Sequence, residues 1–214
     1  MGVFLDAHKL SYISVPKIAT TSFHRLFFEI ENGQPFRPFT ANGKRYYISN
    51  FYRSTPFEKL DTAAMADHTR LALVRDPVRR LLSCYSNRVV HHRELSPQKA
   101  RRRLAQADLP PDPDLASFVA KLPAYCAAVP SIGWHARPMV DFLGPDPAFY
   151  TRLYRIEDSA GMLAEIHRLT GSDVALKRSQ TGGPKIDPDT LSAAQIARLR
   201  DFYAQDYEVY GRHV

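Results

Sequence analysis

The residues Tyr12–Phe23, with the sequence YISVPKIATTSF, decide the fold of this chain. A short β-prone run, Leu10–Val15, stops at Pro16, and an apolar helical face begins at Phe23. Between them lie Lys17, Ile18, Ala19, Thr20, Thr21 and Ser22. A strand–turn–helix of this kind points backbone N–H groups and the helix dipole at whatever lies above the turn, and the lysine and hydroxyls favour an anion there. The stretch predicts a phosphate or sulfate site, with an ordinary capped strand–helix connection as the alternative.

The turn differs from that of the usual P-loop nucleotide triphosphatases. Those enzymes follow the pattern G-x-x-x-x-G-K-[ST], whereas this stretch has no glycine and its lysine precedes the hydroxyl residues. We therefore do not expect a triphosphatase.

A second strand–helix boundary lies further along the chain. Thr69–Val74 (TRLALV) is typical of a buried strand, Asp76 is a good N-cap and Pro77 suits a first helical position. Arg75 then lies at the carboxyl end of a strand, where open α/β sheets bind their ligands, and Ser83 follows about two helical turns later. Arg75 and Ser83 could meet at one phosphate. Taken singly, a salt-bridged arginine and a helix-surface serine are the alternatives.

Together these segments resemble the sulfotransferase family. VPKIATTSF is similar to the family's 5′-phosphosulfate loop, and RDPVRRLLSCY to its 3′-phosphate motif. The resemblance continues through WHARPMVDFL, LYRIEDSAGML and LSAAQIARLRDFYAQDYEVYG, in the family's order. It implies an α/β fold, a P-loop-like three-layer sandwich with a central, mostly parallel sheet flanked by helices. It also implies transfer of a sulfuryl group from 3′-phosphoadenosine 5′-phosphosulfate to a hydroxyl, of a carbohydrate or glycolipid, without a metal.

The resemblance assigns roles to residues of this sequence. Lys17 would neutralise the leaving phosphate, and the loop from Ile18 through Ala19, Thr20, Thr21 and Ser22 would hold the 5′-phosphate. Arg75 and Ser83 would hold the 3′-phosphate. A basic, glycine-containing segment near the C-terminus closes over that phosphate in relatives, and here Arg178, Gly182 and Gly183 are the candidates, against a surface loop with incidental charge.

The general base is the least determined part of the site. A hydroxyl acceptor must lose a proton, and histidine suits that role near neutral pH. His135 lies in the segment similar to the family's His-x-x-Pro string and is our candidate; a structural histidine bonded to a carbonyl is the alternative. Asn50 stands where many relatives carry a histidine, and Ala19 stands where they carry glycine, so the turn needs either a φ below zero or some strain. His24 and Asn50 are the positions to which the search would return.

Composition agrees with one compact enzyme. The 214 residues suit a single α/β domain, with residues 97–127 as a helical insert. No stretch approaches the roughly 18 apolar residues of a membrane span. Because anchored relatives carry such a span, we expect a cytoplasmic, bacterial enzyme. Cys84 and Cys126 are too few for a disulfide framework and are expected to be free thiols.

Two other classes of function are consistent with part of the sequence. An inactive or regulatory nucleotide-binding module of the same fold would explain Ala19 and Asn50. A basic nucleic-acid-binding protein would explain the net charge of +7, but no helix-turn-helix, zinc or aromatic-stacking signature accompanies it, so we expect no nucleic-acid partner. The sequence does not indicate an oligomeric state.

The pattern of strands and helices alternates along the chain. Strands are expected at Leu10–Val15, Arg45–Ser49, Leu71–Arg75 and Tyr150–Arg155. Helices are expected at Thr21–Ile30, Pro77–His91, Pro97–Gln106, Leu115–Ala127, Ser159–Leu169 and Ser192–Tyr207.

Overall fold

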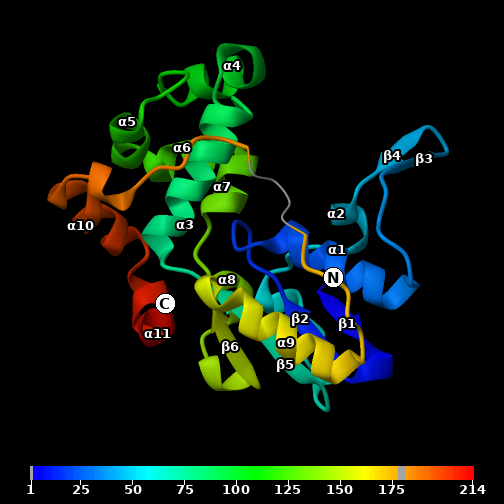
Figure 1. The fold of residues 1–214 in the computed structure, drawn as a ribbon. Coiled ribbons are helices and arrows are strands. Elements are labelled where there is room, and N and C mark those ends of the chain that lie inside the picture. The colour runs from blue at the N-terminus through cyan, green and yellow to red at the C-terminus, as the bar shows by residue number, and fades with distance from the viewer. Residues whose placement is uncertain (1, 178–181) are drawn as a thin grey trace. The chain divides into compact units, whose positions relative to one another are not determined.

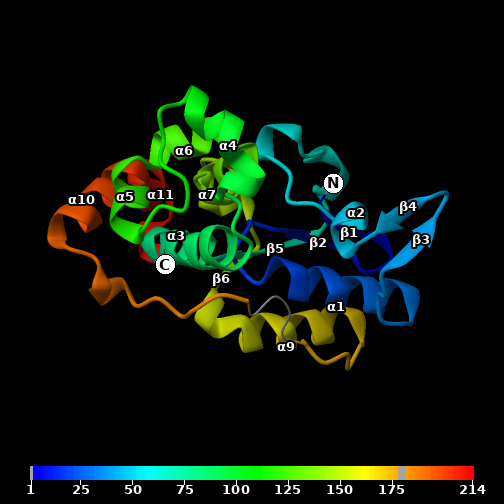
Figure 2. The ribbon, with the colours of Figure 1, turned by 90° about the horizontal axis from the view of Figure 1, so that it is seen from above.

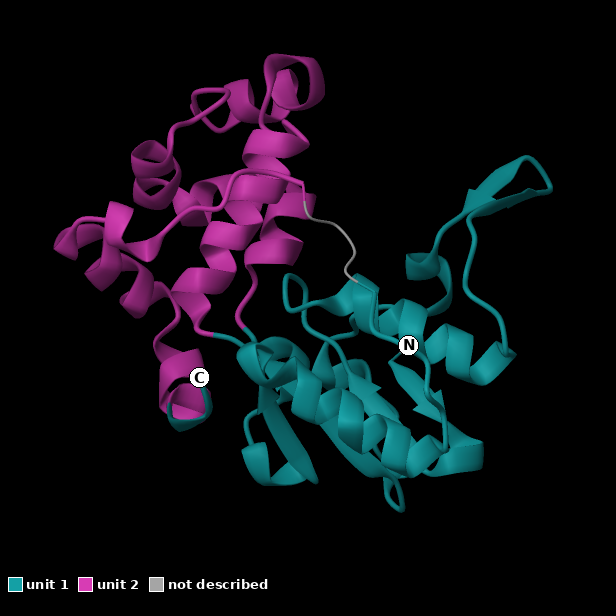
Figure 3. Cartoon of the chain, in the orientation of Figure 1, with its two compact units in different colours: residues 1–75, 139–180, 212–214 teal, residues 76–138, 181–211 magenta. Residues whose placement is uncertain are grey.

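A computed structural model describes residues 2–177 and 182–214. The chain divides into two compact units, coloured separately in Figure 3. Unit 1 comprises residues 1–75, 139–180 and 212–214, and unit 2 comprises residues 76–138 and 181–211. The helical block expected as an insert, residues 97–127, lies inside unit 2, which also contains the helices on either side of that block.

Unit 1 is built on a four-stranded sheet in the order β1-β2-β5-β6. The strands are β1 (Val3–Leu5), β2 (Leu10–Ile13), β5 (Thr69–Val74) and β6 (Arg152–Arg155). β1 pairs antiparallel with β2, whereas the β2–β5 and β5–β6 pairs are parallel. Helices α1 (Thr20–Asn32) and α9 (Ser159–Thr170) run along the sheet (Figure 2). The predicted α/β class, a mostly parallel sheet flanked by helices, is confirmed.

The two central strands are apolar because they are covered on both faces. All four residues of β2 are buried, as are Leu71–Val74 of β5. Continuous burial is typical of parallel strands, which read as apolar runs rather than as an alternating pattern. The parallel pairing of β2 with β5 brings their carboxyl ends to the same edge of the sheet.

One predicted strand of unit 1 is wrong. The range expected as a strand, Arg45–Ser49, contains the end of β4 (Lys44–Tyr46) and the start of a short helix, α2 (Ile48–Phe51). β4 pairs with β3 (Phe39–Ala41) in a separate two-stranded hairpin (Figure 1). Its turn, Asn42-Gly43, has φ values of 50° and 70°, which an Asn-Gly pair adopts readily.

Unit 2 is helical. Its first helix is α3 (Pro77–Cys84), which continues as a π-helix over Tyr85–His91, so the helix predicted for residues 77–91 is present with a wider second half. The remaining helices are α4 (Pro97–Gln106), α5 (Leu115–Ala120), α6 (Leu122–Ala128), α7 (Pro130–Ala136), α10 (Ala193–Phe202) and α11 (Ala204–Tyr210). Two predicted helices are each divided, at Lys121 and at Tyr203, and α7 was not predicted.

Short elements complete the chain. Unit 1 also contains helix α8 (Val140–Leu143). Short 3-10 turns occur at Asp6–His8, Phe57–Lys59, Ala63–Met65, Pro147–Phe149, Ile156–Asp158, Pro188–Thr190 and Gly211–His213. Cys84 and Cys126 are free thiols, as predicted, and Cys84 is fully buried.

Candidate functional site

The turn between β2 and α1 has a left-handed backbone at two positions. Lys17 has a φ of 71°, and Ala19, the N-cap of α1, has φ 50° and ψ 17°. A side-chain-bearing residue in this region costs about 1–2 kcal/mol relative to a right-handed one. Concave turns that alternate in handedness direct successive N–H groups toward one point and bind anions. Without glycine at position 19 the turn needed either a φ below zero or some strain, and the structure has the positive φ and therefore the strain.

Two of the three hydroxyl residues of the turn, Thr20 and Ser22, make hydrogen bonds that close it. Thr20 Oγ1 donates to the carbonyl of Val15 at 2.5 Å, and the Ser22 N–H donates to the carbonyl of Ala19 at 3.0 Å. These two groups therefore stabilise the turn itself. Thr21 is half-buried and lies in the first turn of α1, where helix N–H groups have no intrahelical acceptor. The amides of Thr20 and Thr21, which precede Ser22 in the first turn, are the donors that the turn offers to an anion.

The second motif of unit 1 reaches this turn. Arg75 directly follows β5, and its Nη1 donates to the main-chain carbonyl of Lys17 at 3.1 Å. The two residues are 58 positions apart in the sequence, and the parallel register of β2 with β5 brings them together. A guanidinium and an ammonium side chain therefore start from the same edge of the sheet, at the N-terminus of α1.

The rest of the second motif lies on α3 in unit 2. Asp76 caps this helix by accepting from the Arg79 N–H at 2.9 Å, and it also accepts from the Tyr207 hydroxyl at 2.9 Å. Pro77 occupies the first turn, so the predicted start of the helix is confirmed. Burial, with the neighbouring Asp76 carboxylate, raises the pKa of Tyr207. Ser83 is half-buried near the end of α3.

Arg80, also part of this motif, is fully buried. Its guanidinium donates to the main-chain carbonyls of His135 at 3.3 Å and Arg137 at 2.5 Å, and it lies 5.5 Å from the centre of the Tyr203 ring. The two carbonyls accept from Nη1 and Nη2 and the aromatic face favours the charge, whereas the buried Nε has no hydrogen-bond partner among the described residues. Arg80 therefore fixes the C-terminal end of α7 against α3.

His135 lies near the end of α7, in a polar network within unit 2. Its Nδ1 is 2.7 Å from the Ser131 carbonyl, and its Nε2 is 2.6 Å from Arg88 Nη2. A carbonyl only accepts and a guanidinium only donates, so Nδ1 carries the proton and the ring is neutral. Arg88 also donates to Glu94 at 2.9 Å, and Glu94 accepts from the Ser131 hydroxyl at 2.8 Å. The lone pair that a general base needs faces Arg88 in this arrangement.

The C-terminal glycine segment lies close to the π-helix of unit 2. A Cβ on Gly183 would lie 2.5 Å from the Ser86 carbonyl oxygen, and one on Gly182 would lie 2.6 Å from His91 Nε2. Gly183 has a φ of 102°, and the Ser86 hydroxyl donates to the Pro184 carbonyl at 2.5 Å. Gly182 and Gly183 therefore pack closely against the π-helix, and their assignment to the 3′-phosphate stays a prediction. Arg178 lies outside the described residues.

Sequence reasoning did not identify a buried polar chain beside the turn. His24 Nε2 and Ser14 Oγ are 3.0 Å apart, and Ser14 Oγ is 3.0 Å from Ser54 Oγ. Burial lowers the pKa of His24 to about 3. The burial of His24 could have been inferred from its position one helical turn after Thr20, which puts it on the sheet-facing side of α1. Asn50 is used locally, because its side-chain oxygen accepts from the Tyr47 N–H at 2.7 Å.

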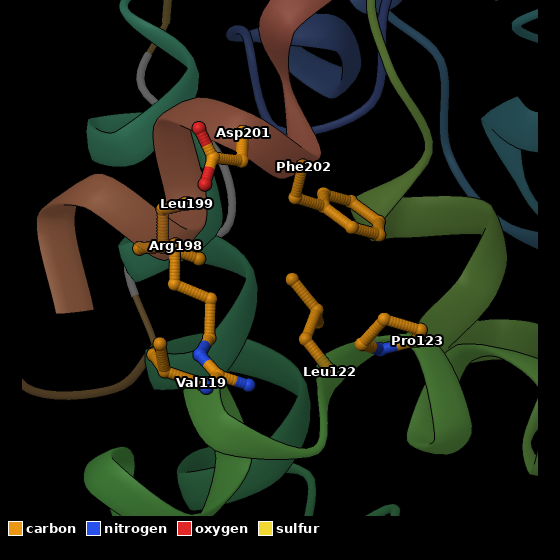
Figure 4. Close-up of a pocket in the computed structure, with 7 residues that line it drawn as sticks. All are labelled: Val119, Leu122, Pro123, Arg198, Leu199, Asp201 and Phe202. Carbon is orange, nitrogen blue, oxygen red and sulfur yellow. The ribbon is translucent and has the colours of Figure 1, made fainter. Parts of the chain in front are cut away.

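A separate cavity of about 290 Å³ lies within unit 2 (Figure 4). Its walls come from α5, α6 and α10 and comprise Val119, Leu122, Pro123, Arg198, Leu199, Asp201 and Phe202. Arg198 donates to the Ala120 carbonyl at 3.0 Å, so its charge is directed at the wall. None of the residues predicted from the sequence lines this cavity.

A protein-family model matches nearly the whole chain. A model described as the sulfotransferase family matches residues 3–211. The chain belongs to the sulfotransferase family. No match was found among curated proteins or among solved structures. The matched residues include parts of both compact units.

Two further findings concern the part of the chain that the structure describes. No helix within residues 2–177 and 182–214 is long and apolar enough to cross a membrane. Over the same residues, no group of three or more His, Cys, Asp or Glu side chains is arranged to hold a metal ion.

Proposed function

We propose that this sulfotransferase uses 3′-phosphoadenosine 5′-phosphosulfate as donor and a hydroxyl of a carbohydrate or glycolipid as acceptor, without a metal. The observation that carries the proposal is the left-handed turn at Lys17 and Ala19, with Arg75 donating to it from the neighbouring strand. An anion-binding turn beside two cations fits a ligand with several phosphate-type groups. We also retain a cytoplasmic location and a bacterial source as proposals.

The residues of the turn suit the 5′ end of this donor. The donor supplies an activated sulfuryl group. The Lys17 ammonium would neutralise charge that develops on the leaving phosphate, a term that matters most in the transition state. The amides of Ala19, Thr20 and Thr21 and the Thr21 hydroxyl would hold the 5′-phosphate, while the Ile18 and Ser22 amides and the Thr20 hydroxyl keep the turn closed. Catalysis in such a site depends mainly on positioning and charge stabilisation.

We assign the 3′-phosphate to Arg75 and Ser83, with Arg178, Gly182 and Gly183 as further contacts. A guanidinium binds a phosphate through paired hydrogen bonds and keeps its charge at any relevant pH. Because Arg75 also donates to the Lys17 carbonyl, it would contact both the 3′-phosphate and the turn that holds the 5′-phosphate.

His135 is our candidate for the residue that accepts the proton of the acceptor hydroxyl. Its Nδ1–H is held by the Ser131 carbonyl, which orients the ring and leaves Nε2 as the basic atom. Arg88 donates to that atom, so the acceptor hydroxyl would have to replace Arg88 there. The prediction is that His135→Gln lowers turnover and keeps donor binding. Near-parental turnover would exclude His135 as the general base and leave His24 and Asn50 as the candidates.

The donor assignment is tested by calorimetric titration with 3′,5′-bisphosphoadenosine. Arg75→Ala should weaken binding roughly 10- to 150-fold, as expected for a hydrogen bond to a charged group worth about 1.5–3 kcal/mol. Arg79→Ala is the matched control, because Arg79 is an exposed arginine of the same motif. If Arg75→Ala binds the bisphosphate as tightly as the parent, the 3′-phosphate assignment is wrong.

Lys17→Ala separates the role of the lysine from that of the arginine. Its bisphosphate affinity should fall less than that of Arg75→Ala, while turnover with a panel of sugar and glycolipid acceptors should be almost lost. Equal losses of binding and turnover in both variants would contradict the proposed division of roles.

The alternative, an inactive nucleotide-binding module, has two observations in its favour. Ala19 strains the turn, and the Asn50 side chain is occupied in capping α2. Tight bisphosphate binding with no turnover on any acceptor would favour this alternative.

A further inference from the structure

A segment of unit 1 outside the donor site is rich in aromatic and basic residues and contains no carboxylate. Residues 33–57 include Arg37, Lys44, Arg45 and Arg53, and no Asp or Glu. The hairpin β3–β4 and helix α2 form the middle of this segment, residues 36–53, which we call the aromatic arm. In Figures 1 and 3 the hairpin projects away from the four-stranded sheet of its own unit.

The aromatic arm exposes apolar rings to solvent. Phe39, Tyr47 and Phe51 have exposed fractions of 46%, 50% and 42%. In the described residues only Val90 is a comparably exposed large apolar side chain elsewhere. Single exposed apolar residues are ordinary, but several gathered on one short segment indicate an interaction surface.

The rings are held in place by their neighbours. Phe39 and Tyr46 lie opposite each other in the hairpin, and their rings stack with centroids 5.1 Å apart and planes 10° apart. Phe36 is buried and packs edge-on against Phe51 at 5.5 Å and Phe28 at 5.1 Å. The arm is therefore an ordered aromatic cluster whose outer side remains exposed.

Cations accompany these rings. The Lys44 ammonium lies 5.2 Å from the Tyr46 ring centre, and the Arg45 guanidinium lies 5.7 Å from the Tyr47 ring centre. Lys44 and Arg45 are adjacent in β4 and so point to opposite faces of the hairpin, and each has an aromatic ring beside it. Each pair therefore places positive charge next to apolar ring surface.

We propose that the aromatic arm binds an anionic lipid surface. Aromatic rings are favoured at the boundary between headgroups and acyl chains, and each Lys or Arg near an anionic leaflet adds attraction. A second copy of this chain fits less well, because two arms would bring eight cations together and residues 36–53 contribute no carboxylate of their own.

The test is flotation of the protein with vesicles, in the absence of donor, so that it does not depend on sulfuryl transfer. Vesicles of phosphatidylcholine mixed with phosphatidylglycerol should bind the parent, and vesicles of phosphatidylcholine alone should bind it much less. Lys44→Gln/Arg45→Gln should weaken binding to the anionic vesicles roughly thirtyfold, from about 1 kcal/mol per cation. The matched control is Arg101→Gln/Arg102→Gln on α4, which removes two exposed charges elsewhere and should bind like the parent.

A second measurement does not depend on loss of binding. In Tyr47→Trp, anionic vesicles should shift the added tryptophan emission to the blue, after subtraction of the signal from the one native tryptophan. An unshifted emission, or equal losses in the arm and α4 double variants, would overturn the proposal. The proposal would also be overturned if the parent bound heparin but not vesicles, and if Lys44→Gln/Arg45→Gln abolished the heparin binding. Self-association that the arm substitutions abolish, without vesicle binding, would also overturn it.

Discussion

Replacing Ala19 with glycine should stabilise the protein, although glycine usually destabilises a helix. Ala19 has a φ of 50°, where a Cβ costs about 1–2 kcal/mol, and glycine removes that cost. Against this stands the greater backbone freedom that glycine loses on folding, about 0.5–1 kcal/mol. The net gain in the free energy of unfolding should be about 0.5–1 kcal/mol, a rise in Tm of about 1–4 °C for a chain of this length.

The assay is thermal unfolding of the parent and of two glycine variants. Ala197→Gly is the control, because Ala197 is exposed in the middle of α10, where the backbone is right-handed and glycine should lower the free energy of unfolding by about 0.5–1 kcal/mol. The two substitutions make the same chemical change and should shift Tm in opposite directions. If Ala19→Gly lowers Tm as Ala197→Gly does, the left-handed turn, and the anion site built on it, is wrong.

Two further predictions concern buried titratable groups. The folded pKa of His24 is lowered to about 3, so the unfolded state binds a proton there that the folded state does not, and stability should fall as pH drops from about 6.5. His24→Gln should flatten this fall in denaturant titrations between about pH 4 and 6, and a slope equal to that of the parent would contradict the burial of His24. Burial raises the pKa of Cys126 to about 12, so this thiol should react with a disulfide reagent at pH 8 only after denaturation, and rapid reaction of the folded protein would argue against it.

The elements that carry local signals were predictable from the sequence. Asp76 and Pro77 mark the start of α3, and the run from Thr20 marks the start of α1, because capping and proline geometry act over a few residues. The Asn42-Gly43 turn also carries such a signal, but the strands on either side of it are only three residues long. The pattern predicts a single strand at Arg45–Ser49 in their place. Short elements depend on their neighbours more than on their own pattern.

Of the contacts in the candidate site, only those set by the order of the strands in the sheet could be predicted from the sequence. Arg75 and Lys17 meet because two parallel strands end at one edge, and the order of the strands implies this. The contact between Arg88 and His135 joins residues 47 positions apart on two helices, and no local pattern encodes it. The inward turn of the Thr20 hydroxyl and the use of the Ser22 amide to close the turn depend on backbone angles that residue types alone do not determine.

The π-helix over Tyr85–His91 makes the length of this segment matter more than its composition. The His92 N–H donates to the Asn87 carbonyl at 2.9 Å, five residues back rather than four, so the segment holds one residue more than an α-helical turn would. Deleting any one residue here would restore the ordinary turn and rotate everything on one side of the deletion by about 100° relative to the other. After deletion of Val89 or Val90, which lie between them, Arg88 could no longer face His135 while His91 faces Gly182. Substitutions in this stretch should be tolerated far more often than insertions or deletions.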